Sequence, residues 1–151
     1  MESCIFLKQF REIAPPEMKE KTPSRVGLKH GIELFNQAEF FEAHEVLEDV
    51  WRACSAGTSR RRHLQGLVQL AVAFHHESRG NLVGARSVLE RGTKNLAGAE
   101  ESLPELDLAR LHRALADWQG HLSGTGSRPA LPRIALRRAK KRSSPARIRE
   151  K

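Results

Sequence analysis

The sequence predicts an all-α protein, a single compact antiparallel bundle of about five helices. Apolar residues recur every three or four positions through most of the 151-residue chain, the spacing that places them on one face of an α-helix. No segment alternates apolar and polar residues as a half-buried strand does. A chain of this length builds one core of ordinary size. We therefore expect an N-terminal extension over 1–23, one helical domain over 24–122 and a disordered basic tail over 123–151.

Each helix is predicted from its apolar stripe and from the residues at its ends. Thr22-Pro23 opens the first, since threonine caps a helix and proline suits its first turn. Ser59 is the expected cap of the third, and Gly80-Asn81 ends it. The short turns between helices favour antiparallel neighbours. The five helices are expected at about 22–36, 39–54, 59–78, 82–96 and 107–122.

A weak internal repeat supports this arrangement. The segment 38–47 matches the segment 80–89 at an offset of 42 residues, with Phe40, Ala43 and Leu47 aligned with apolar residues of the second copy. This period suits helical hairpins of the tetratricopeptide kind. We expect one bundle that contains two similar hairpins.

The net charge of +8 is concentrated at the C-terminal end. Residues 128–151 carry ten Lys or Arg and one acidic residue, Glu150, which leaves 16 basic and 17 acidic residues in 1–127. The tail has no aromatic residue and little apolar periodicity, so burial cannot offset its loss of conformational entropy. It either solubilises the protein or contacts nucleic acid without sequence specificity through residues 128–151.

Membrane insertion and secretion are not expected. The longest strongly apolar stretch, 64–74, is interrupted by Gln65 and Gln69 and is far shorter than the roughly 20 residues of a membrane span. The first residues have no basic segment that leads into an apolar block. We expect a cytoplasmic protein.

The candidate site lies on the second and third helices. His44, Glu48 and Trp51 are four and three residues apart, so they lie near one face of a helix and border its apolar stripe. His75 falls among core positions of the following helix. If the two helices form an antiparallel hairpin, His75 approaches the level of His44, and Glu48 approaches Gln65 or Gln69.

Three interpretations of this cluster remain open. His44, Glu48 and His75 are candidate ligands of a divalent metal ion, zinc or similar, because histidine and carboxylate ligands from facing helices hold metals inside bundles. The same groups suit metal-free acid–base chemistry. In the third interpretation, Glu48 accepts a hydrogen bond from His44, or from the Trp51 indole, within a satisfied polar patch of the core. Trp51, Phe41, Gln65 and Gln69 are the expected supporting residues of the pocket.

Three ordered segments carry a family resemblance. They are 35–51, 64–75 and 80–86, and the first contains the pattern His-x-x-x-Glu-x-x-Trp at His44, Glu48 and Trp51. Over about residues 29–97 the sequence resembles the prokaryotic helical family named domain of unknown function 309. The resemblance implies an all-helical fold and no established activity, and metal binding has been suggested for that signature.

Two classes of function follow as hypotheses. In the first, the protein binds a divalent metal or a small polar ligand in a pocket formed by His44, Glu48 and His75, and hydrolysis is a candidate reaction. In the second, it is a non-enzymatic helical binding module. Such a module contacts a protein partner with its hairpins or nucleic acid with its basic tail.

Overall fold

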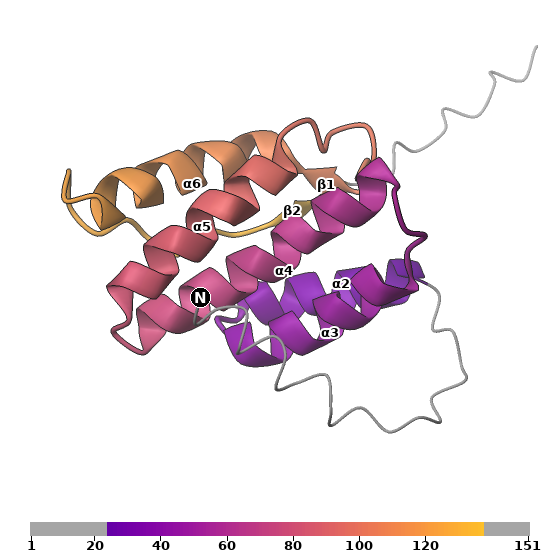
Figure 1. Cartoon of the computed structure of the whole chain (residues 1–151), viewed down its shortest axis with the longest axis horizontal. Helices are drawn as coiled ribbons and strands as arrows, with labels where there is room; N and C mark the ends of the chain where they lie inside the picture. The colour runs from indigo at the N-terminus through magenta and orange to yellow at the C-terminus, as the bar shows by residue number, and fades with distance from the viewer. Residues whose placement is uncertain (1–23, 138–151) are drawn as a thin grey trace, which may run out of the picture.

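The computed structural model describes residues 24–137 and has the predicted all-α architecture. Figure 1 shows the helices stacked side by side, with α4 and α5 between the α2–α3 pair and α6. Two short strands complete the fold. The elements are α2 (Ser24–Asn36), α3 (Phe40–Ala53), α4 (Ser59–Ser78), α5 (Leu82–Leu96), β1 (Leu106–Asp107), α6 (Leu108–Leu122) and β2 (Ala135–Leu136).

A chain of aromatic rings joins four of the helices in the core. Phe35 of α2 contacts Phe40 of α3 and Phe74 of α4 edge-on, with ring centroids 5.2 and 5.9 Å apart. Phe74 also meets the ring of Trp118 of α6 at 5.1 Å. All four side chains are buried. Edge-on aromatic pairs add to the stabilisation from buried area, so these rings fix how the helices pack.

Helix α4 is the central element of the bundle. Its residues from 66 to 74 are buried on nearly every side, apart from Gln69. Gly66 of α4 and Gly92 of α5 permit the close crossing of these helices, because a Cβ on Gly66 would lie 3.0 Å from the Gly92 carbonyl oxygen. A helix that is apolar all round is one that the rest of the domain surrounds.

The internal repeat corresponds to two turns of the same geometry. Ala38, after α2, and Gly80, after α4, are aligned by the repeat and both adopt a left-handed backbone, with φ of 62° and 79°. In each turn the next amide donates to the carbonyl five residues earlier, at 3.0 Å for Glu39 and 2.9 Å for Asn81. This is the hydrogen bond of the Schellman motif. The predicted pair of similar hairpins is therefore confirmed.

We predict that Ala38→Gly stabilises the protein by roughly 0.5 to 1 kcal/mol. Alanine pays a steric cost for the left-handed conformation that glycine avoids, as Gly80 does at the equivalent turn. The matched control is Ala116→Gly at an exposed position inside α6, where glycine should cost about 1 kcal/mol. Urea unfolding of both variants measures the difference. Destabilisation by Ala38→Gly would contradict the strain argument.

The predicted disordered tail needs correction over residues 123–137, which we call the C-terminal strap. Figure 1 shows the strap returning from the end of α6 along the bundle to β2. The side-chain amide of Asn36 donates to the Ile134 carbonyl at 2.9 Å and accepts from the Ile134 amide at 2.8 Å. Ile134 is 1% exposed. The part of the predicted tail beyond residue 137 lies outside the described residues.

Further contacts hold the strap along its length. The Trp118 indole donates to the Ala130 carbonyl at 2.9 Å, and the Arg128 guanidinium pairs with Glu77 at 2.9 Å. The strap ends in an antiparallel pairing of β2 with β1, Leu136 opposite Leu106. These contacts offset the conformational entropy that the strap loses on ordering, which was the reason to predict disorder. Most of them are made by the strap backbone, so the side-chain sequence of the strap does not show them.

Helix bounds agree with prediction apart from details at the ends. The cap of α4 is Thr58 rather than Ser59, because the Thr58 hydroxyl accepts from the Arg61 amide at 3.2 Å. The predicted Thr22-Pro23 opening of the first helix lies outside the described residues. Within 24–137, no helix is long and apolar enough to cross a membrane.

Candidate functional site: the polar row of helix α3

Three polar side chains four residues apart form a row along α3. The Nε2 atom of His44 lies 3.1 Å from one carboxylate oxygen of Glu48, and Nη2 of Arg52 lies 2.5 Å from the other. His44 and Glu48 are buried, at 1% and 5% exposure. Both oxygens of the carboxylate therefore have a nitrogen partner from the same helix. We call His44, Glu48 and Arg52 the polar row.

The surroundings of Glu48 favour its charged form. Burial alone would raise the pKa of Glu48, but the hydrogen bond with His44 and the positive charge of Arg52 outweigh it, so this pKa lies below its ordinary value. A buried carboxylate with two such partners is satisfied within the fold. The 3.1 Å contact between His44 Nε2 and the Glu48 carboxylate is the pair that the third interpretation expects.

Phe41 links the polar row to His75. The ring centroid of Phe41 lies 6.4 Å from that of His44 and 5.7 Å from that of His75. The two histidines thus lie on the same side of the bundle. His75 is half-buried rather than a full core residue, since it stands near the end of α4.

The environment of His75 favours its neutral form. Burial lowers the pKa of His75, and electrostatic repulsion from Arg79 and the neighbouring histidines lowers it further, while Glu42 opposes them. A neutral imidazole is the form that accepts a proton or ligates a metal.

The described residues do not assemble the predicted metal centre. Within 24–137, no group of three or more His, Cys, Asp or Glu side chains is placed to hold a metal ion. In the polar row, Arg52 occupies the carboxylate oxygen that His44 leaves open. Metal binding by His44, Glu48 and His75 stays a prediction that a measurement on the protein must decide.

Trp51 of the signature faces a separate pocket of about 450 Å³ where α3 turns into α4. Its ring lies under the Arg61 guanidinium, 4.7 Å from the ring centroid. Arg61 also donates to the last carbonyls of α3, at 2.6 Å for Cys54 and 3.2 Å for Trp51, so it caps that helix. The pocket is lined by Trp51, Gly57, Thr58, Ser59, Arg61, Arg62 and Gln65.

The two predicted supporting glutamines point to different places. Gln65 lines the Trp51 pocket. Gln69 instead accepts a hydrogen bond from the Asn95 amide of α5 at 2.7 Å, so it joins α4 to α5 and does not support the site. Sequence periodicity places both on the flank of α4, but it does not tell which neighbouring helix each flank meets.

Sequence reasoning missed two polar contacts. Arg52 follows Glu48 by four residues, and this spacing was a usable signal for an ion pair. His63, which the sequence does not indicate as a metal ligand, is 3% exposed and bonds through Nδ1 to the Ser102 hydroxyl. Its Nε2 lies 3.2 Å from the Ala97 carbonyl oxygen and 3.4 Å from a guanidinium nitrogen of Arg62. Burial lowers the pKa of His63. These partners are more than 30 residues away along the chain and have no local signal.

Comparison with known proteins matches part of the chain to one family. Residues 28–88 match the family model described as domain of unknown function (DUF309). The predicted family resemblance is confirmed over this segment. The DUF309 match covers most of α2 and all of α3 and α4, including the polar row and the Trp51 pocket. It ends within α5, so α6 and the strap lie outside it.

Relatives of the DUF309 segment are themselves uncharacterised. The chain is 31% identical over 77 residues to the uncharacterised protein YpuF of Bacillus subtilis (strain 168), a match that covers 51% of this chain and 44% of YpuF. It is 25% identical over 93 residues to an uncharacterised protein of Aquifex aeolicus (strain VF5), covering 62% of this chain and 28% of that protein. The matches thus span less than half the length of either relative.

Proposed function

We propose that the protein is a non-catalytic binding module that holds a small oxyanion, of the phosphate class, in the Trp51 pocket. In this proposal His44 and Glu48 do not contact the ligand. They support the helix that presents Trp51, and Arg52 completes their hydrogen bonding. The signature then contains two structural residues and one binding residue.

The observation that carries the proposal is an unused donor on Trp51, a residue that lines a positively charged pocket. The Trp51 Nε1 atom is buried and has no acceptor among the residues described. A buried donor without a partner is costly, and a ligand oxygen would satisfy it. Arg61 and Arg62 line the same pocket, and no acidic residue among residues 24–137 does.

The start of α4 adds to the attraction for an anion. Helix N-termini carry a partial positive charge and free amide hydrogens, and Thr58 and Ser59 of this terminus line the pocket. The guanidinium of Arg61 is held by the carbonyls that end α3, so its charge is fixed in position before a ligand arrives. The pocket volume of about 450 Å³ is in the range of small-molecule sites.

Binding of inorganic phosphate tests the proposal. We expect saturable amide chemical-shift changes confined to residues 51–65, and a Kd that rises about 5-fold to 10-fold in Trp51→Phe, which keeps the ring but removes the N–H donor. Arg62→Gln should weaken binding similarly. The matched control is Arg113→Gln, which replaces an exposed arginine of α6 and should bind phosphate as the wild type does. Equal affinities for the wild type and Trp51→Phe would refute the proposal.

The same protein sample decides the metal and hydrolase hypothesis. Stoichiometric zinc or another divalent metal in elemental analysis, lost in both His44→Ala and Glu48→Gln, would replace the proposed function with a metal site at the polar row. Nucleic acid contact through residues 128–151 stays a separate prediction, because most of that segment lies outside the described residues. Loss of salt-sensitive RNA or DNA binding on deletion of 138–151 would assign it to the tail.

A further inference from the structure

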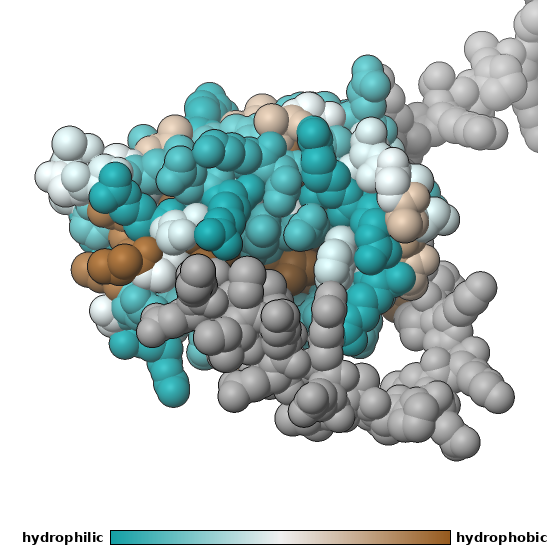
Figure 2. Space-filling view, viewed as in Figure 1, coloured by the Kyte–Doolittle hydropathy of each residue, from teal (hydrophilic) through white to brown (hydrophobic). Residues whose placement is uncertain are grey.

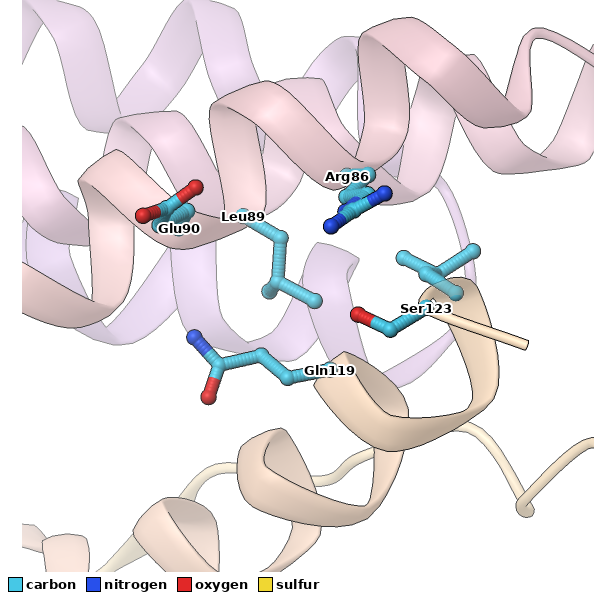
Figure 3. Close-up of a pocket in the computed structure, with 6 residues that line it drawn as sticks. Arg86, Leu89, Glu90, Gln119 and Ser123 are labelled. Carbon is cyan, nitrogen blue, oxygen red and sulfur yellow. The ribbon is translucent and has the colours of Figure 1, made fainter. Parts of the chain in front are cut away.

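A second pocket, of about 250 Å³, lies between α5 and α6. Figure 3 shows Arg86 and Leu89 of α5 facing Gln119 of α6 and Ser123, the C-cap of α6, across it. It lies partly outside the DUF309 match, since α6 follows that segment. The lining residues are Arg86, Leu89, Glu90, Gln119, Leu122 and Ser123.

Arg86, the positively charged residue of this pocket, has no ion-pair partner in the described part of the chain. Arg86 makes no hydrogen bond or ion pair with any residue between 24 and 137. Glu90 is one helical turn away and has the right spacing for a pair, but its carboxylate lies 3.3 Å from Lys94 on the following turn. The side chains of Gln119 and Ser123 likewise have no hydrogen-bond partner in the described part of the chain. Arg86, Gln119 and Ser123 therefore line one pocket, and each has a side-chain hydrogen-bond donor without a protein acceptor in the described part of the chain.

Apolar residues continue from the pocket onto the surface. Leu89 is fully buried and forms part of the lining, together with the partly buried Leu122. Leu82 and Val83 precede Arg86 by four and three residues, so they lie on the same side of α5, and they are 52% and 83% exposed. Figure 2 shows hydrophobic residues exposed at the left end of the molecule, where α5 begins. Exposed apolar side chains beside a pocket often mark a binding surface.

We infer that the α5–α6 pocket binds a small carboxylate that has an apolar body. The planar guanidinium of Arg86 matches a carboxylate through two parallel hydrogen bonds. Gln119 and Ser123 supply further donors, and the carbon chain lies on Leu89, Leu122 and Val83. A dianion is disfavoured, because Glu90 lines the same pocket. This site is independent of the Trp51 pocket and does not depend on the proposed function.

The test compares three six-carbon probes on the full-length protein. Hexanoate is expected to give saturable amide shifts confined to residues 82–93 and 118–124, with a Kd about 10-fold to 100-fold lower than that of hexanol, as expected for a charge-assisted contact. Hexylamine should not bind. Arg86→Gln should raise the Kd of hexanoate to that of hexanol, and Val83→Ser should raise it less.

The control is again Arg113→Gln, which removes an exposed arginine from α6 outside the pocket and should leave the Kd of hexanoate unchanged. Arg86 is exposed, so its replacement should not alter the melting temperature. Three results would each overturn the inference: no saturable shifts with hexanoate, equal affinity for hexanoate and hexanol, or an unchanged Kd in Arg86→Gln.

Discussion

Replacing Ile134 with alanine is expected to lower the free energy of unfolding by about 2 to 5 kcal/mol, the range for truncating a large buried aliphatic side chain. Ile134 is 1% exposed, and the two hydrogen bonds between its backbone and Asn36 hold it in place. The cavity left by alanine cannot collapse easily, because α2 and the strap are fixed on each side of it. Urea unfolding monitored by circular dichroism measures the loss.

The matched control lies in the same strap. Leu136 is 38% exposed, so Leu136→Ala should change stability by no more than about 0.5 kcal/mol. Chain truncation gives a second comparison. A chain that ends at residue 137 should have the wild-type melting temperature, whereas a chain that ends at residue 123 should have a much lower one. Equal stability of these two chains would show that the strap does not contribute to the fold.

The second large effect is expected at the polar row. Glu48→Ala should destabilise the protein by about 1 to 3 kcal/mol, because it leaves buried His44 without its carboxylate partner and removes the ion pair of Arg52. Glu45→Ala is the control, since Glu45 is exposed on the same helix and should cost no more than about 0.5 kcal/mol. Equal losses in the two variants would contradict the role assigned to the row.

The contribution of Glu48 should also depend on pH. Its pKa in the folded protein lies below the ordinary value of 4.5, so the unfolded chain binds the proton more readily. The stabilisation is therefore complete above about pH 4.5 and is lost as the pH falls through the folded pKa. The difference in unfolding free energy between wild type and Glu48→Gln should shrink from pH 7 to pH 3. A constant difference would mean that the charge of Glu48 is unimportant.

Local rules predicted the helices well. Gly80 and the Asn81 cap fix the α4–α5 turn, and the repeat aligns the α2–α3 turn with it, so sequence spacing alone placed most helix ends within a residue. Spacing also paired His44 with Glu48, since both lie on one helix.

Apart from the Arg52 pair and the α4 cap, the errors concern contacts between distant segments. Ile134 begins a short apolar segment, 134–136, that is flanked by arginines. No periodicity shows that Asn36 binds its backbone. The direction of Gln69 and the environment of His63 likewise depend on how α4 meets α5 and the residues after it. Such contacts follow from the packing of whole helices, which a local pattern does not encode.

The hydrogen bonds between Asn36 and Ile134 join residues that are 98 positions apart. At the usual rate of translation, about 5 to 20 residues per second, Asn36 waits about 5 to 20 s for Ile134 to be synthesised. The hairpins need only near neighbours and fold early, because local contacts form fastest. During that interval a nascent chain presents the surface that Ile134 later covers. This surface is then accessible to chaperones and to other nascent copies of the chain, until the strap is synthesised and covers it.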